Sequence, residues 1–419
     1  MSQLDLSSLA TSNLKGGDND EHGIKYWHSE SAPVRRIETT SNSTKEVSPR
    51  EKNPHEAEIL LPEELENVEL APLDIFEFFW IPEILHSLSE NTNAYYAVQR
   101  KSHACRKWKP TTAQEIGVFL GLLIAMGVNR CKSPNDLWRK TSGIRIYVPV
   151  WKRPVSKAMG NNRFFQIKQY FHVSPPSSVI GPDNWWEKLE PLSSKMRESC
   201  KRYYLPSTSV TVDEMMIRFG GRSKHTVRMP NKPITEGYKV FAICDHGYTI
   251  NWRFHSRVKG IGELSSAYRD SVGISAPTTA VVYQLAESSL PYREYDFVIY
   301  MNNLFSTVAL FSKLRSIGIG ACGTARLQAG RFPLEYNNNA KDIPWNTVVG
   351  GAVSDSNGLA SVLAMQWQDN NHVHALSTIH TLDEKVTRSR KRPRLTSTSV
   401  TGTVGVGTMK PRNTTEAKT

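Results

Sequence analysis

The chain has 419 residues, room for two or three domains, and 39% hydrophobic residues with 10 tryptophans are enough for well-packed cores. Its 52 Lys and Arg against 40 Asp and Glu give a net charge of +12, which favours a polyanionic partner and disfavours an enzyme with an acidic surface. The five cysteines stand singly, without zinc-site spacing, as is typical of a reducing compartment. The start lacks the order of a signal peptide, and the longest apolar run, 116–128, is too short to span a bilayer. We therefore expect an intracellular protein with no membrane partner.

Both ends of the chain differ in composition from its middle. Residues 1–66 are rich in Ser, Asn, Glu and Lys, so we expect a disordered tail. Residues 385–419 are predicted to form a second, basic disordered tail. This tail contains a basic block that is typical of a nuclear-import or nucleic-acid patch, with a solvated charge run as the alternative. We expect import into the nucleus through Arg388, Arg390, Lys391, Arg392 and Arg394.

Residues 67–205 are predicted to form a helical amino-terminal subdomain of the dimerisation or DNA-binding type. Apolar residues recur at roughly helical spacing from Pro72 onward. Thr112 and Glu115 have the spacing of a capping box that opens the apolar run 116–128.

Two more helices are expected in the same subdomain, over 162–171 and 185–204. The first has an aromatic face suited to burial, and its Arg163 and Lys168 are expected to stay in solvent. The second carries many basic groups.

Residues 206–335 are predicted to form an α/β core with a mixed sheet, because three strands are followed by alternating helices and strands. Residues 336–384 are expected to be a partial β insertion region. The expected strands are 209–219, 237–250, 251–258 (with a turn at 245–247), 295–301, 319–326, 361–368 and 372–380, and the expected helices are 277–290 and 306–317.

Asp213 is the first candidate for chemistry. Alternation puts Val210 and Val212 on one face of the first strand and Asp213 on the other. A carboxylate at the end of such a strand costs desolvation energy unless it is paired, hydrogen-bonded or holding a cation. The alternative is that Asp213 caps the next turn or pairs with Arg218 or Arg222.

The end of the first strand and the end of the fourth are distant in sequence but neighbours in a sheet of this kind. Two carboxylates there could share divalent cations about 3.5 to 4 Å apart, one activating water and the other stabilising the leaving oxygen. Asp213 supplies the first carboxylate. The residue at the carboxyl end of the fourth strand is Asn302, an amide.

Seven short segments occur in a characteristic order over about residues 68–381. They are 92–95, 112–127, 162–164, 212–216, 232–239, 321–326 and 367–378. In this order they resemble the piggyBac family of transposases. The resemblance implies a ribonuclease-H-like core and a Mg²⁺- or Mn²⁺-dependent enzyme that cuts and rejoins DNA with three aspartates, the first matching Asp213.

The other two family aspartates are not found at their expected places. Asn302 stands where the second belongs, and it offers one neutral oxygen where a hard cation prefers charge. Asp296 lies roughly 20 Å back along the same strand and cannot replace it. The third belongs to a Gly-Val-Asp segment after residue 378, which this sequence lacks, as it lacks the family's cysteine-rich zinc module. We expect a truncated, degenerate member in which Asp213 binds metal weakly and cut-and-join activity is lost.

The leading hypothesis is a catalytically inactive, DNA-binding remnant of a cut-and-paste transposase. The alternatives are a co-opted nuclear DNA-binding or recruitment protein, and a fragment of an active transposase. The expected partners are DNA, either transposon ends or non-specific, and a second copy in a homodimer. Two basic clusters are candidates for DNA contact, with burial in the core or ordinary surface placement as the alternative. They are Lys195, Arg197, Lys201 and Arg202 in one, and Arg106 and Lys107 in the other.

Overall fold

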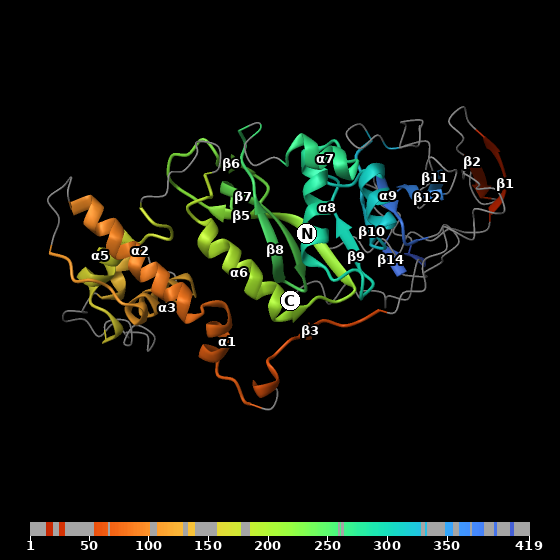
Figure 1. Cartoon of the computed structure of the whole chain (residues 1–419). Helices are drawn as coiled ribbons and strands as arrows, with labels where there is room; N and C mark the ends of the chain where they lie inside the picture. Colours follow the sequence, from red (N-terminus) through yellow and green to blue (C-terminus); the bar gives the residue numbers. More distant parts are fainter. Residues whose placement is uncertain are drawn as a thin grey trace. The chain divides into compact units, whose positions relative to one another are not determined.

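The computed structural model of the chain divides into two compact units, whose helices and strands are numbered along the chain in Figure 1. The helical unit runs from Leu60 to Tyr203, and the sheet unit is formed by residues on either side of it. Within the described part of the chain, no helix combines the length and apolarity needed to cross a membrane. The structure describes residues 14–19, 25–29, 54–65, 68–100, 107–128, 133–138, 157–176, 185–258, 260, 264–327, 332, 348–354, 360–368, 371–380, 389–391 and 403–405.

The helical unit is held together by apolar helix faces. Ile116 and Phe119 are buried with Phe164 and Ile167, and the rings of Phe119 and Phe164 lie 5.2 Å apart. Its described helices are α1 Pro72–Phe79, α2 Pro82–Arg100, α3 Ala113–Val128, α5 Asn161–Tyr170 and α6 Glu190–Arg202, with short 3₁₀ turns η2 Glu63–Leu65 and η3 Pro134–Leu137.

Glu115 links two of these helices in a way that the capping pattern does not predict. Its backbone N–H donates to Thr112 Oγ1 at 3.2 Å, as a capping residue requires. Its carboxylate, however, accepts two hydrogen bonds from the Arg163 guanidinium, at 2.7 and 2.6 Å. The expectation that Arg163 stays in solvent is therefore wrong, because its side chain is only 17% exposed and is neutralised by Glu115.

The sheet unit is built on one mixed sheet of nine described strands. Its order is β11-β12-β13-β10-β9-β5-β7-β6, with β8 paired to β7. β5 is antiparallel to β7 but parallel to β9, and β9 is parallel to β10, so the predicted mixed α/β fold is confirmed. The strands are β5 Ser209–Arg218, β6 Val227–Arg228, β7 Glu236–Asp245, β8 Tyr248–Phe254, β9 Val298–Met301, β10 Gly320–Thr324, β11 Val348–Ser354, β12 Ala360–Gln368 and β13 His372–Ser377.

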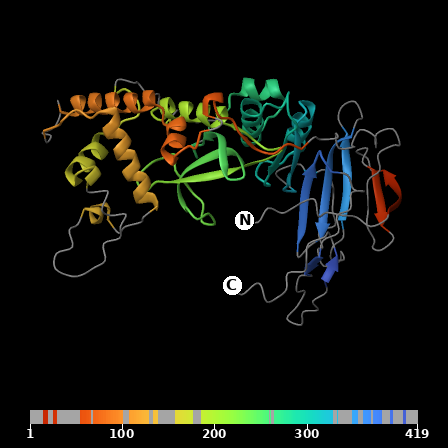
Figure 2. The same cartoon turned by 90° about the horizontal axis from the view of Figure 1, so that it is seen from below.

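Two helices pack against this sheet (Figure 1). α8 Pro277–Ser289 contacts β7 and β8, and α9 Val308–Ser316 contacts β10, β12 and β13. Their buried side chains join Val210 and Val212 of β5 in one core. The short helix α7 Ser266–Val272 also packs there and was not expected from the sequence. Figure 2 shows the meander β11, β12 and β13 (blue) side by side, and it includes the predicted strand pair 361–368 and 372–380.

The β7–β8 hairpin turns at the predicted residues, 245–247, but the predicted strand bounds differ from the observed ones. β7 ends at Asp245 and β8 begins at Tyr248, so the boundary expected at 250–251 is wrong. The two turn residues, His246 and Gly247, have φ of 44° and 88°, as a tight two-residue hairpin turn requires.

Part of the range predicted to be an amino-terminal tail is held in the fold. β3 Glu58–Ile59 pairs with β4 Tyr204–Leu205. His55 is fixed beside it, because its backbone N–H donates to Thr208 Oγ1 at 2.7 Å and its ring nitrogen lies 2.8 Å from Pro206 O. The tail prediction is therefore wrong for this stretch. Residues about 150 positions away in the sequence hold it in place, and no local apolar pattern indicates this. Two short strand pairs also lie inside the ranges predicted as tails: β1 Leu14–Asn19 with β2 Lys25–Ser29, and β14 Ser389–Lys391 with β15 Thr403–Gly405.

Candidate functional site

Strand pairing brings Asp213 and Asn302 to the same edge of the sheet. In the parallel β5–β9 ladder, Val212 stands opposite Met301, so the two polar residues follow at matching positions. The expectation that Asp213 and Asn302 are neighbours is confirmed, although β9 ends beside the middle of β5, which continues to Arg218. Gly323 of β10 makes the arrangement compact, because a Cβ there would lie 2.4 Å from the Met301 carbonyl oxygen and 2.6 Å from Ser306 Oγ.

The Asn302 side chain is fixed by three hydrogen bonds. Its Nδ2 donates to Asp213 Oδ1 at 2.9 Å and to Glu214 Oε2 at 3.2 Å. Its Oδ1 accepts from the backbone N–H of Leu304 at 2.8 Å. Only the amide nitrogen can face two carboxylates favourably, which fixes the orientation of the amide. Its nitrogen and its oxygen are therefore both already hydrogen-bonded within the chain.

Two lysines complete the cluster. Lys232 Nζ lies 3.5 Å from Asp213 Oδ2 and 3.8 Å from Glu214 Oε2, and Lys239 Nζ lies 3.4 Å from Glu214 Oε1. The Glu214 and Lys239 side chains are only 7% and 13% exposed, whereas that of Asp213 is 48% exposed. Glu214 is therefore the buried member of the acidic pair, and its charge is balanced from within the chain.

The two carboxyl groups titrate in opposite directions. Burial raises the pKa of Asp213, and the hydrogen bond shared with Glu214 raises it further. Burial also acts to raise the pKa of Glu214, but the hydrogen bond from Asp213, the Lys239 charge and the Asn302 amide outweigh it and lower that pKa. Burial lowers the pKa of Lys239 despite its carboxylate partner. The two carboxyl groups are therefore coupled, and Glu214 is the one that keeps its charge as the pH falls.

These residues do not fit a pair of divalent cations. Mg²⁺ and Mn²⁺ require oxygen ligands, and Asn302 turns its N–H groups, not its oxygen, toward the carboxylates. The Lys232 ammonium lies within 4 Å of both carboxylates and supplies positive charge to them. No group of three or more His, Cys, Asp or Glu side chains suited to a metal occurs among the described residues. The cluster is instead an internally neutralised ion-pair network.

Sequence reasoning singled out Asp213 and Asn302 but assigned no role to Glu214, Lys232 or Lys239. A signal for Glu214 was present, because alternation places it on the face of β5 that carries the buried Val210 and Val212. The two lysines required the register of β5 with β7, in which Met216 stands opposite Lys239.

The residues predicted to contact DNA are spread over several elements. Lys195, Arg197, Lys201 and Arg202 all lie on α6. Arg197 binds Glu190 and, at 2.7 Å, Ser193 Oγ of its own helix, while the Arg202 guanidinium lies 5.5 Å from the Tyr203 ring centre. Lys107 precedes α3, and Arg106 lies outside the described residues. Of the predicted import cluster, Arg390 and Lys391 lie in β14, and Arg388, Arg392 and Arg394 lie outside the described residues.

Comparison with known proteins gives a consistent result. A family model described as Transposase IS4, of the DDE type, matches residues 71–400. Human PiggyBac transposable element-derived protein 3 is 27% identical over 279 residues, covering 65% of this chain and 43% of that protein. Human PiggyBac transposable element-derived protein 2 is 24% identical over 319 residues, covering 75% of this chain and 49% of that protein. The chain thus spans about half the length of these relatives.

A solved structure shares the fold. It is the cryo-EM structure of a piggyBac transposase synaptic complex with hairpin DNA, with a TM-score of 0.59 and 21% identity, and the match covers 76% of this chain and 63% of that one. The ordered motifs, the mixed sheet and these matches agree. The chain belongs to the family of piggyBac-type DDE transposases.

Proposed function

We propose that this chain is a transposase-derived DNA-binding protein that does not cut DNA by the metal-dependent mechanism of its family. Its net charge of +12 supports a polyanionic partner. The solved relative with the same fold is described in complex with hairpin DNA. DNA is therefore the partner that the family and the charge both favour.

One observation carries the loss of cleavage. The amide nitrogen of Asn302 donates to both Asp213 and Glu214, and its oxygen is used by the Leu304 backbone. The Lys232 ammonium lies within 4 Å of both carboxylates. A cation pair would have to displace this ammonium and would gain only one neutral oxygen from Asn302, which does not offset the loss of its hydration shell.

Cleavage is tested with supercoiled plasmid and a DNA hairpin in the presence of Mg²⁺ or Mn²⁺. We expect no nicking above that of the Asp213→Ala variant, and retained binding of the hairpin in a gel shift at low salt. Nicking by the wild-type chain that disappears in Asp213→Ala would overturn the proposal of lost cleavage. Absence of any gel shift at low salt would overturn the proposal of DNA binding.

We also propose a nuclear location, because the DNA partner resides there and the block from Arg388 to Arg394 has the charge density of an import signal. A fluorescent fusion is expected to accumulate in the nucleus and to lose that accumulation when the five basic residues of the block are changed to glutamine. Unchanged distribution of the variant would contradict the assigned signal.

A further inference from the structure

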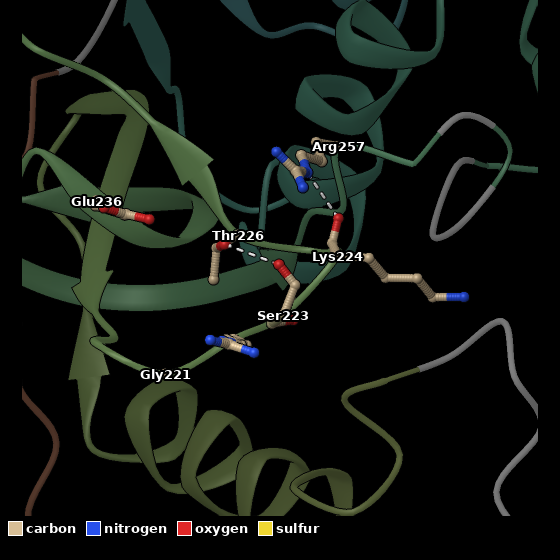
Figure 3. Close-up of a pocket in the computed structure, with 7 residues that line it drawn as sticks. Gly221, Ser223, Lys224, Thr226, Glu236 and Arg257 are labelled. Atoms are coloured by element: carbon tan, nitrogen blue, oxygen red, sulfur yellow. Dashed lines mark hydrogen bonds between the residues drawn. The ribbon is translucent and has the colours of Figure 1, made fainter.

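A second polar feature lies at the other end of the β5–β7 ladder. It is an open hollow of about 530 Å³, drawn in Figure 3, which we call the basic hollow. Its walls come from the β5–β6 connection, the start of β7 and the segment after β8. The lining residues are Gly221, Arg222, Ser223, Lys224, Thr226, Glu236 and Arg257.

Hydrogen bonds hold the walls of the basic hollow in place. Arg257 Nε donates to the Lys224 carbonyl oxygen at 2.8 Å, and Thr226 Oγ1 donates to the Ser223 carbonyl oxygen at 3.1 Å, as Figure 3 shows. Beneath them, the ring of the buried His225 lies 2.9 Å from Ser256 Oγ. A loop fixed in this way loses little entropy when it binds a ligand.

The cations of the basic hollow are left for a partner. Three cationic side chains, Arg222, Lys224 and Arg257, face one carboxylate, Glu236, and none of the three forms an ion pair with a carboxylate in the part of the chain that is described. All three are exposed. Burial lowers the pKa of the neighbouring His225, and the charges of Lys224 and Arg257 lower it further.

The composition of the lining selects the ligand class. Guanidinium, ammonium and hydroxyl groups are the donors that phosphate oxygens accept. The lining contains no apolar side chain that would hold a peptide residue. These features favour a phosphodiester backbone over a phosphorylated peptide.

The ladder also separates the basic hollow from the acidic cluster. Asp213 stands opposite Ala242 and Arg218 opposite Gly237, so five residues, about 17 Å, separate Asp213 from the end of β5, and the first lining residue, Gly221, lies three residues beyond that end. At 3.4 Å of rise per nucleotide, about 17 Å corresponds to about five nucleotides of one DNA strand.

We propose that the basic hollow clamps the phosphate backbone of DNA several nucleotides from the position that lies at Asp213 and Asn302. This inference rests on the proposed function, because it assigns the residues through which DNA is held. Arg222 and Lys224 each neutralise one phosphate, and Arg257 both anchors the loop and adds a third positive charge.

The test uses the full chain and a fluorescent duplex of about 30 base pairs, with binding measured by anisotropy from about 0.05 to 1 M salt. The variant is Arg222→Gln/Lys224→Gln, whose side chains make no hydrogen bond with described residues. The matched control is Arg293→Gln/Lys313→Gln, which removes two cations elsewhere on the sheet unit that contact only the rings of Tyr292 and Tyr283.

We expect the variant to lower the steepness of log K against log salt by about 1.8, which is about 0.9 for each lost phosphate contact. If the affinities converge at 1 M, this amounts to a loss of roughly 60-fold at 0.1 M salt. The control is expected to keep the wild-type slope.

The outcomes separate the two proposals. Wild-type binding with an unchanged slope in the variant would overturn the clamp and leave DNA binding standing. If the same variant lost binding to a phosphoserine peptide but kept its binding to the duplex, the clamp would also be overturned, in favour of a peptide partner. Absence of duplex binding by the wild-type chain at the lowest salt would instead remove the proposed function itself.

Discussion

The two ends of the β5–β7 ladder treat charge in opposite ways. At one end, the carboxylates of Asp213 and Glu214 meet Lys232 and Lys239 within 4 Å. At the other end, the cations of the basic hollow face solvent, and only one carboxylate lies among the seven lining residues. Charges that are balanced inside the chain hold strands together, whereas charges that are left unbalanced are available to a polyanion. The sheet therefore has a structural end and a proposed binding end.

The largest expected effect comes from breaking the structural end. Glu214→Leu leaves the Lys239 ammonium buried without its carboxylate, and removing one partner of a buried pair costs about 3 to 5 kcal/mol of unfolding free energy. Glu214→Leu/Lys239→Met removes both charges and is expected to recover most of that loss. Urea unfolding followed by circular dichroism measures both. A single variant as stable as the wild type would show that Glu214 and Lys239 do not stabilise the fold as a pair.

Acid should reduce the contribution of the Glu214 cluster to the free energy of unfolding. The folded-state pKa of Glu214 is lowered below its ordinary 4.5, so the unfolded chain takes up the proton first as the pH falls. The stabilisation is thus complete above pH 4.5 and is lost as the pH falls through the folded-state value of about 2. Asp213, whose pKa is raised, contributes with the opposite sign and is removed by working in an Asp213→Asn background.

In that background Lys239, Asn302 and Lys232 still favour the Glu214 charge, so adding Glu214→Gln should lower the free energy of unfolding at pH 6, and by progressively less toward pH 2. Acid unfolding monitored at several urea concentrations gives the difference. A cost that stays constant from pH 6 to pH 2 would mean that the Glu214 charge contributes nothing.

A smaller effect is expected from the backbone contact that positions Asn302. Gly323→Ala forces a Cβ to within 2.4 Å of the Met301 carbonyl oxygen, and overpacking of this kind costs about 1 to 3 kcal/mol. Gly121→Ala is the matched control, because no atom lies within 4 Å of its added Cβ and alanine is favoured over glycine in a helix. Thermal unfolding should therefore shift down for the first variant and up or not at all for the second. Equal shifts would contradict the close approach at Asn302.

The sequence predicts the frame of this site but not its charge balance. Alternation along β5 was sufficient to place Val210 and Val212 in the core and Asp213 on the opposite face. Family resemblance was sufficient to pair Asp213 with Asn302. The same alternation buries Glu214, yet its neutralisation by Lys239 depends on the β5–β7 register, which is set by pairing across a 17-residue connection and not by local pattern.

The basic hollow could not be predicted from the sequence for a related reason. The loop 221–226 reads as a polar connection, and only the folded hairpin brings Arg257 to it from the far end of β8. Likewise, nothing local in the sequence shows that His55 pairs with Thr208, 153 residues away. Long-range hydrogen bonds of single side chains leave no periodic trace.

The smallest expected effect is a null result that separates the two ends of the ladder. Arg222→Gln/Lys224→Gln removes exposed side chains without a described partner, so the free energy of unfolding should change by less than about 0.5 kcal/mol. Asp213→Asn is expected to leave the salt dependence of DNA binding unchanged, because this slope counts cation–phosphate contacts and the Asp213 carboxylate makes none. Urea unfolding and fluorescence anisotropy are measured on both variants, so that stability and DNA binding are compared for each end of the ladder. If the basic variant unfolds far more easily, or if the Asp213 variant changes the salt slope, then charge at the two ends is not divided between folding and binding.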